Sequence, residues 1–327
     1  MITRALTFIA AVCIPICALL LAGCAGIRKT PGLLEVIAPP PASEIRAVSF
    51  NIRFAGNQTG ERSWAERLPL VVAAIRATSP DILGLQEAER RQIDDLLEAL
   101  PEYAFAGVGR DDGRDGGEFS PILYRHARFD LLDQRTFWFS EAPGQAGSRA
   151  WGANLPRICT TALLVEATTS RRLRVFNVHL DHQSDYSRLR SVELLSQAIF
   201  DTRQVGTPVV VLGDLNAEPD SSALGYLLGR RRTATDDANR SIPASPALLD
   251  ALATLPAADQ QTGTFHNFTG MPQGQRIDHV LVDRTIRVRS AFIDRSSESG
   301  RYPSDHFAVG AVLLIGPNSP VGSGAGN

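Results

Sequence analysis

The sequence predicts a mixed α/β fold, in which mixed β-sheets are covered by helices within one large domain. Short apolar runs recur along the chain, and several have the continuous apolar pattern of strands that are buried on both faces. Helical periodicity appears between some of these runs, but the predicted strands outnumber the predicted helices. No internal linker and no repeat of fixed period divides residues 45–316.

Eight strands are expected from these apolar runs, at residues 47–52, 81–85, 121–124, 161–165, 173–180, 208–212, 277–282 and 307–315. Helical periodicity predicts three helices, at residues 68–76, 91–100 and 187–203. Pro69 would suit the first turn of the first helix, because a proline there removes no hydrogen bond that the helix needs.

Charge and composition exclude several classes of protein. The 327 residues carry 33 Lys and Arg against 35 Asp and Glu, which gives a formal net charge of −2. With 44% hydrophobic and 21% charged residues, the chain is neither collagen-like, coiled-coil nor disordered. A near-neutral chain has no general attraction to nucleic acid, so any affinity for phosphate must be local.

The amino-terminal segment has the pattern of an export signal. A positive start at residues 1–4 precedes an apolar run at 5–21, which is shorter than the roughly 20 residues of a membrane-spanning helix. A short membrane anchor is the alternative interpretation. The sequence Leu-Ala-Gly-Cys at 21–24 resembles the bacterial lipobox, which implies that Cys24 is lipidated and becomes the mature amino terminus.

These features predict how the chain is organised and where it is located. The predicted segments are a lipoprotein signal peptide at 1–23, a Pro-rich linker at 24–44, a folded domain at 45–316 and a disordered tail at 317–327. Ala25 is not the aspartate that is associated with inner-membrane retention in enterobacteria, so we expect a lipid-anchored protein on the periplasmic face of the outer membrane. Only Cys159 remains in the folded part, where it is expected to be a small buried strand residue.

Polar side chains gather at the ends of the predicted strands. Six such segments carry carboxylate, amide or imidazole groups beside an apolar run, at 49–53, 85–87, 177–182, 213–216, 276–279 and 304–306. Each segment alone could be a turn, a helix cap or a buried histidine. Because strands fix position while their loops expose side chains, one site built from all six is the economical hypothesis.

The six segments, in this order, resemble the endonuclease/exonuclease/phosphatase superfamily of DNase I-like proteins. Further stretches at 108–113, 120–124, 155–159 and 300–306 are similar to an exported bacterial branch of it. The resemblance covers nearly all of residues 45–316, and it implies an α/β four-layer αββα sandwich, with two mixed β-sheets flanked by helices. It also implies a metal-dependent hydrolase of phosphoric esters, either a phosphodiesterase or nuclease, or a phosphatase.

The resemblance implies a metal site and a group that activates water. Glu87 would be the main ligand of Mg²⁺, with Mn²⁺ as the other candidate ion, helped by Asn51 and Asp305. A hard cation of this kind prefers oxygen ligands. Asp214 would orient or deprotonate the attacking water, and Asn216 would hold it in line with the phosphorus.

The implied phosphate-binding groups are histidines and arginines. His306 would donate to the scissile phosphate, oriented by Asp278 behind it, and His179 would assist the phosphate or the leaving group. Further candidate phosphate contacts are Arg157 and Arg53, because a guanidinium can bind two phosphate oxygens.

The segment after His179 offers two more candidates for the substrate-phosphate site, Asp181 and His182. Regular strand alternation would put Asp181, rather than His182, on the same face as His179, so Asp181 is the preferred candidate. The acidic loop at 111–118 does not match the calcium-loop pattern and is expected to be a rim loop.

Several alternatives stay open at this point. A non-catalytic binding lipoprotein could use the same fold, and a sphingomyelinase or a phosphoinositide phosphatase is possible within the superfamily. No Gly-x-Ser-x-Gly run supports a serine hydrolase. We expect a monomer that acts on a phosphoester, either nucleic acid or a small phosphodiester or phosphomonoester, and that contacts the membrane through Cys24.

Overall fold

The computed structural model describes residues 43–56, 58–203, 207–230, 244–260 and 262–316. The predicted signal peptide, Cys24 and the tail at 317–327 lie outside the described residues, as does most of the predicted linker.

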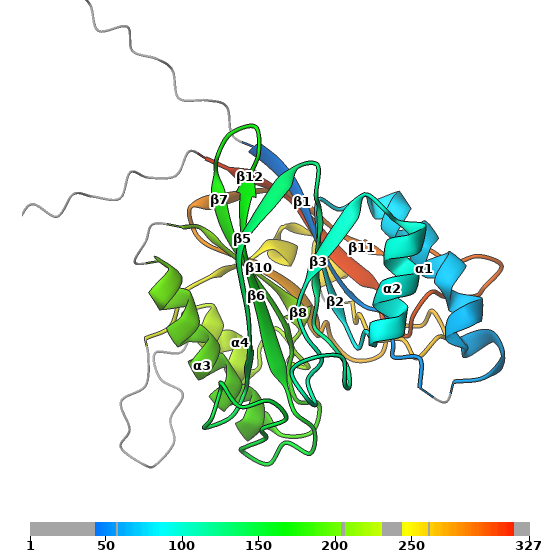
Figure 1. The fold of residues 1–327 in the computed structure, drawn as a ribbon, viewed down its shortest axis with the longest axis horizontal. Coiled ribbons are helices and arrows are strands. Elements are labelled where there is room, and N and C mark those ends of the chain that lie inside the picture. Colours follow the sequence, from blue (N-terminus) through cyan, green and yellow to red (C-terminus); the bar gives the residue numbers. More distant parts are fainter. Residues whose placement is uncertain (1–42, 57, 204–206, 231–243, 261, 317–327) are drawn as a thin grey trace, which may run out of the picture. The chain divides into compact units, whose positions relative to one another are not determined.

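The first β-sheet has six strands in the order β11-β12-β1-β2-β4-β3. Figure 1 labels five of them, β1, β2, β3, β11 and β12. Their bounds are β1 Ser43–Asn51, β2 Ile82–Gln86, β3 Tyr103–Ala106, β4 Ile122–Arg125, β11 Ile286–Asp294 and β12 Ala308–Ile315. Strands β1 and β2 pair in parallel and the other neighbours pair antiparallel, so the sheet is mixed.

The second β-sheet also has six strands, in the order β5-β6-β7-β8-β10-β9. Their bounds are β5 Phe129–Trp138, β6 Ile158–Glu166, β7 Arg172–His179, β8 Val209–Asp214, β9 Leu249–Asp250 and β10 Asp278–Val282. Here β7 and β8 are the parallel pair, and the other pairs are antiparallel.

The longer helices lie outside the two sheets. The helix bounds are α1 Trp64–Thr78, α2 Arg90–Ala99, α3 Asp185–Arg203, α4 Ser222–Leu227 and α5 Ala257–Gln260, with short 3₁₀ helices η1 Gly60–Arg62 and η2 Ala251–Thr254. Among the described residues, no helix has both the length and the apolarity needed to cross a membrane.

Alternation along the strands produces four layers. In β1, for example, Ala47 faces the second sheet and its neighbour Val48 faces the helices. One apolar cluster fills the space between the sheets, a second packs the first sheet against α1 and α2, and a third packs the second sheet against α3 and α4. The predicted four-layer sandwich of two mixed sheets flanked by helices is therefore confirmed.

The two parallel pairs place the polar strand ends together. Asn51 is paired with Gln86 where β1 and β2 end, and His179 is paired with Asp214 where β7 and β8 end. Because parallel strands end at the same edge of a sheet, each pair delivers two polar segments to one place.

A buried amide connects the two sheets beneath these strand ends. Asn177 in β7 donates from Nδ2 to the carbonyl oxygens of Leu85 (2.7 Å) and Pro121 (2.8 Å) in the first sheet. Its Oδ1 accepts a hydrogen bond of 2.7 Å from Gln86 Nε2. Gly84 leaves room for this amide, because a Cβ there would lie 2.7 Å from Asn177 Oδ1.

Two differences from the expected boundaries change where the fold begins and where Pro69 lies. Strand β1 begins at Ser43, so the last two residues of the predicted linker belong to the fold, where they pair with the end of β12. Helix α1 begins at Trp64, which places Pro69 inside the helix rather than in its first turn. Strands β3, β5, β9 and β11 were not predicted, and all four are edge strands.

Candidate active site

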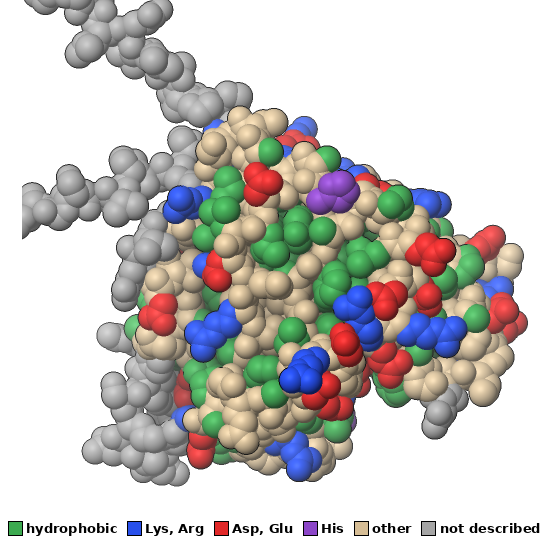
Figure 2. All heavy atoms as spheres, viewed as in Figure 1, with side chains coloured by type: hydrophobic (Ala, Val, Ile, Leu, Met, Phe, Trp, Pro, Cys, Tyr) green, Lys and Arg blue, Asp and Glu red, His purple; other side chains and the backbone are tan. Residues whose placement is uncertain are grey.

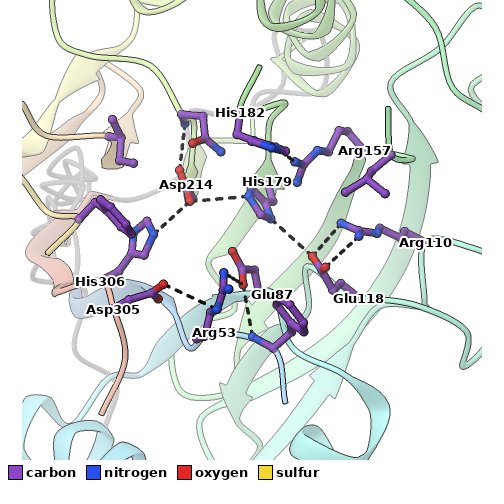
Figure 3. Close-up of a pocket in the computed structure, with 15 residues that line it drawn as sticks. Arg53, Glu87, Arg110, Glu118, Arg157, His179, His182, Asp214, Asp305 and His306 are labelled. Carbon is purple, nitrogen blue, oxygen red and sulfur yellow. Dashed lines mark hydrogen bonds and ion pairs between the residues drawn. The ribbon is translucent and has the colours of Figure 1, made fainter. Parts of the chain in front are cut away.

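The polar strand ends line one cavity of about 470 Å³ (Figure 3). Its lining comes from both sheets and from the loops that follow their strands: Arg53, Phe54, Glu87, Arg110, Glu118, Leu155, Arg157, His179, His182, Asp214, Asn216, Phe265, Ile277, Asp305 and His306. Every one of the six segments singled out from the sequence contributes to it, so the hypothesis of one composite cavity is correct.

Asp214, the last residue of β8, lies at the centre of the polar network. Its Oδ2 lies 3.7 Å from Nε2 of His179 and 3.9 Å from Nε2 of His306. The same oxygen accepts a hydrogen bond of 3.1 Å from Asn51 Nδ2. Burial raises the pKa of Asp214 to about 7, with a further increase from Asp278 and a partial offset from His306. A carboxylate with this pKa is well suited to accept a proton near neutral pH.

His306 forms a buried pair with Asp278. Its Nδ1 lies 2.9 Å from Asp278 Oδ2, and Asp278 opens β10 directly opposite Asp214 in the antiparallel register. Burial by itself lowers the pKa of His306, but the carboxylates of Asp278, Asp214 and Asp305 outweigh burial and raise it to about 10. The ring is therefore charged at neutral pH, and its Nε2–H is a donor at the cavity.

His179, the last residue of β7, has the opposite electrostatic environment. Burial and the charges of Arg157 and Arg110 hold its pKa well below the usual range, so the ring is neutral. Its Nδ1 lies 3.9 Å from Oε2 of Glu118. Glu118 forms two bonds with Arg110, of 2.7 and 2.8 Å, yet burial raises its pKa to about 7.

Asn216 follows Asp214 in a left-handed turn. Its φ is 46°, its backbone N–H donates to Asp214 Oδ1 at 2.9 Å, and its Nδ2 donates to the carbonyl of Leu180 at 3.1 Å. Asparagine tolerates this backbone region better than most residues. The turn orients the Asp214 carboxylate and places the Asn216 side chain at the cavity wall.

Two further residues with left-handed backbone conformations, Glu87 and Arg53, line the cavity. Glu87 follows β2 with φ 59°, and Arg53 follows β1 with φ 57°. Such conformations are costly for residues other than glycine and are typical of functional sites. Arg53 Nη1 lies 3.4 Å from Glu87 Oε2, and its Nε lies 3.7 Å from Asp305 Oδ2.

The carboxylates of Glu87 and Asp305 fit a divalent cation. Both line the cavity and both face the guanidinium of Arg53, which shows that this position attracts positive charge. Burial raises the pKa of Asp305, and the neighbouring charge of Glu87 adds to the effect. Mg²⁺ prefers to bind one or two carboxylates together with waters and substrate phosphates, and the cavity beside these two carboxylates has room for both.

A second group also offers ligand atoms within 4.8 Å of one another, from Asp214, Asp278 and His306. His306 Nδ1 is already bonded to Asp278, and the pKa of about 10 means that its ring would have to lose a proton before binding a metal. The Glu87 and Asp305 carboxylates are therefore the better fit to a hard cation.

Asn51 differs from the expected metal ligand in its orientation. Its Nδ2 donates to Glu87 Oε1 and to Asp214 Oδ2, both at 3.1 Å, while its Oδ1 accepts from the backbone N–H of Arg53 at 3.0 Å. The amide oxygen is thus already bonded to the backbone. Asn51 links the carboxylate expected to bind metal with the carboxylate expected to activate water.

The placement of Asp181 corrects the sequence prediction. Strand β7 ends at His179, so strand alternation does not continue to Asp181. The Asp181 side chain is buried, and its Oδ2 accepts from the backbone N–H groups of Gln183 (3.0 Å) and Ser184 (2.8 Å). His182 lines the cavity instead, together with Arg157.

Sequence reasoning gave no role to two polar residues of the cavity, Arg110 and Glu118, and it ranked a third, His182, below Asp181. Arg110 lies in the stretch 108–113 that carried part of the family resemblance, but that stretch was given no role. Glu118 ends a loop that was expected only to form the rim. His279, which sequence grouped with Asp278, lies elsewhere, because its Nε2 bonds to the carbonyl of Ala217 at 2.9 Å.

Comparison with known proteins agrees with this arrangement. The family model described as "Endonuclease/Exonuclease/phosphatase family" matches residues 48–306. This chain belongs to the endonuclease/exonuclease/phosphatase family. The match contains all six polar segments and confirms the resemblance to this family that is seen in the sequence.

Solved members of the endonuclease/exonuclease/phosphatase family share the fold. A family protein from Bacteroides thetaiotaomicron is 29% identical with a TM-score of 0.74, and the alignment covers 84% of this chain and 98% of that one. The mannosyl-6-phosphatase of the same organism is 29% identical with a TM-score of 0.72, over 83% of this chain and all (100%) of that one. Protein angel of Drosophila melanogaster is 23% identical over 85% of this chain and 82% of its own length.

Proposed function

We propose that this chain is a divalent-metal-dependent phosphoester hydrolase, in which Asp214 activates water and His306 stabilises the phosphate. The observation that carries the proposal is the environment of Asp214 Oδ2. This oxygen lies within 4 Å of two histidine nitrogens, at 3.7 and 3.9 Å, and is joined through Asn51 to the Glu87 carboxylate. A proton acceptor, N–H donors and a cation-binding carboxylate thus line one cavity.

Asp214 acts as the group that orients and deprotonates the attacking water. Its carboxylate is held by Asn51 Nδ2 and by the backbone N–H of Asn216, which leaves its position little freedom. The Asn216 side chain lies on the same wall and would keep the water in line with the phosphorus.

The two histidines differ in charge when they act on the phosphate: His306 is protonated and His179 is neutral. His306 carries a proton at neutral pH and donates from Nε2 to a phosphate oxygen, while Asp278 holds the ring in place. His179 is neutral and can assist the phosphate or the leaving group without adding a second positive charge.

The remaining charge stabilisation comes from the side of Glu87. Glu87 and Asp305 would hold a divalent cation, which when bound would neutralise negative charge that develops on the phosphate oxygens. Arg53, which faces both carboxylates, could then direct its donors toward the phosphate.

The cavity favours a small substrate. A volume of about 470 Å³, with Leu155, Phe265 and Ile277 among its walls, is typical of small-molecule sites. Figure 2 shows acidic and basic side chains interspersed on one face of the molecule, which agrees with the net charge of −2. The 29% identical mannosyl-6-phosphatase makes a small phosphomonoester the second candidate beside a small phosphodiester.

Hydrolysis of bis(p-nitrophenyl) phosphate and of p-nitrophenyl phosphate tests the function. The purified protein is assayed with Mg²⁺, with Mn²⁺ and with chelator, beside Glu87→Ala and His306→Ala. We expect turnover that requires metal and is lost in both variants, and the ratio of the two rates separates nuclease-like from phosphatase-like substrates. A folded protein that binds phosphate esters but never turns them over would favour a binding lipoprotein instead.

We also propose that the protein is exported and lipidated at Cys24, on the strength of the signal-peptide and lipobox pattern alone. Labelled palmitate should be incorporated into the wild-type protein. Cys24→Ser should leave an unprocessed precursor without label, whereas normal processing with label still attached would refute the assignment.

A further inference from the structure

The cavity has a second polar wall beside the hydrolytic groups. Arg157 immediately precedes β6, and His182 lies three residues beyond the end of β7, its antiparallel neighbour. Both side chains line the cavity. Figure 3 shows Arg157 on the opposite side of His179 from Asp214.

Arg157 is a buried cation with an unused donor. Its side chain is 3% exposed, its Nη2 is bonded to His182 Nδ1 at 2.8 Å, and its Nε lies 3.6 Å from Asp181 Oδ1. Its Nη1 is also buried and has no hydrogen-bond partner within the part of the chain that the structure describes. Burying an unpaired guanidinium N–H is unfavourable, so this donor is expected to meet an acceptor when the cavity is filled.

His182 adds a second donor of known orientation. Because Nδ1 accepts from Arg157, the proton of the neutral ring is on Nε2. The ring is largely exposed and lines the cavity. Asp181, whose Oδ1 lies 3.6 Å from Arg157 Nε, is not part of the cavity lining and is bonded to backbone N–H groups. Glu118 lines the same cavity, but its carboxylate is paired with Arg110. The Arg157 and His182 pair therefore offers donors alone, which is the chemistry that recognises an oxyanion.

The hydrolytic groups already supply donors for the scissile phosphate. His306 and Asn216 lie at Asp214, and Arg53 lies at Glu87, whereas Arg110 is engaged by Glu118. We propose that Arg157 and His182 form a second subsite, which binds an oxyanion of the substrate other than the phosphate that is hydrolysed. The substrate is then a small phosphoester that carries a second phosphate or a carboxylate. This inference rests on the proposed hydrolase function.

Three probes with one carbon skeleton test the subsite: glycerol 1-phosphate, glycerol 1,3-bisphosphate and 3-phosphoglycerate. Calorimetry on Asp214→Asn protein with Mg²⁺ measures binding without turnover, so the result does not depend on whether the wild-type protein is active. We expect at least one of the two probes with a second oxyanion to bind fivefold or more tighter than glycerol 1-phosphate. Which one binds tighter distinguishes a phosphate from a carboxylate.

Substitution within the Asp214→Asn background assigns the preference to a residue. Arg157→Gln should abolish the preference, and His182→Asn, which replaces an exposed side chain, should reduce it. Arg53→Gln is the matched control, because it should weaken all three probes by the same factor. Equal affinities for the three probes would overturn the proposal. So would an Arg157→Gln variant, folded by thermal melting, that weakens all three alike, since Arg157 would then contact the scissile phosphate.

Discussion

Nδ1 of His306 lies 2.9 Å from Oδ2 of Asp278, and this pair joins the first residue of β10 to the loop that precedes β12. It explains why a fully buried imidazole is charged. Without the carboxylates around it, burial would favour the neutral ring.

Asp278→Asn should therefore lower the pKa of His306 from about 10 toward or below its ordinary value of 6.5. In the wild type, the stabilisation from the charged pair is complete below pH 6.5 and is lost as the pH rises through about 10. The variant should lose turnover by about 10- to 100-fold, the usual effect of removing such a carboxylate. The alkaline limb of its pH–rate profile should move to lower pH, and NMR titration of the ring follows the same change. An unmoved limb would contradict the assignment.

Asp214→Asn should lose about 10² to 10⁴ in kcat, since the substitution removes the proton acceptor. Its melting temperature at pH 8 should stay within a few degrees of wild type, because ionised Asp214 does not stabilise the fold. Since its pKa is raised to about 7, ionisation costs stability increasingly as the pH rises from 3.8 toward 7, and the cost is complete above 7. For the same reason, the Asp214 carboxyl of the metal-free protein should titrate with a midpoint near pH 7.

Asp250→Asn is the matched control for that variant. Asp250 is also a buried carboxylate, but it bonds Arg276 at 3.1 and 2.7 Å outside the cavity lining. Breaking this buried pair should cost about 3–5 kcal/mol in unfolding free energy while leaving turnover per folded molecule near wild type. If Asp250→Asn lost turnover as Asp214→Asn does, the special role of Asp214 would be lost.

Glu87→Gln should weaken binding of Mn²⁺ or Mg²⁺ by about tenfold or more, because one of the two carboxylates that fit the cation loses its charge. Calorimetric titration measures the affinity. Glu118→Gln is the comparison, since Glu118 lines the same cavity but is bonded to Arg110. Equal effects of the two substitutions would place the cation elsewhere in the cavity.

Gly84→Ala should destabilise the protein by about 1–3 kcal/mol, the usual cost of overpacking a buried site. The added Cβ would lie 2.7 Å from Asn177 Oδ1 and 3.0 Å from Leu212 Cβ, between the two sheets. Urea denaturation measures the loss. Gly144→Ala, where a Cβ has no atom within 4 Å, should change stability little, and similar losses in the two variants would count against close packing at Gly84.

Strand prediction succeeded or failed according to burial. All eight strands expected from apolar runs are present, whereas the four that were missed are the edges of the two sheets. Edge strand β5 shows the reason. Five of its ten residues are exposed, and the polar side chains of four of these, Asp130, Asp133, Gln134 and Arg135, interrupt any apolar run. A pattern of apolar residues reports burial rather than hydrogen bonding, and edge strands are bonded on one side without being fully buried.

The residues to which we assign chemical roles in the proposed function were recognisable from sequence because their types are unusual beside apolar strands. Each lies at the end of such a strand or within two residues of one: Asp214, His306, Asp278, His179 and Glu87. Strand ends and local alternation are properties of the chain itself. The candidate site could be predicted from these patterns together with the family resemblance, and so could the four-layer fold.

Only the tertiary structure decided which side chains face one another. In the structure, the Asn51 amide nitrogen donates to two carboxylates. Asp181 does not line the cavity, whereas Glu118 and His182 do. These outcomes depend on how two sheets pack and on where each strand stops. Contacts between segments more than a hundred residues apart, such as Asn51 and Asp214, are set by that packing and leave no periodic signal in the sequence.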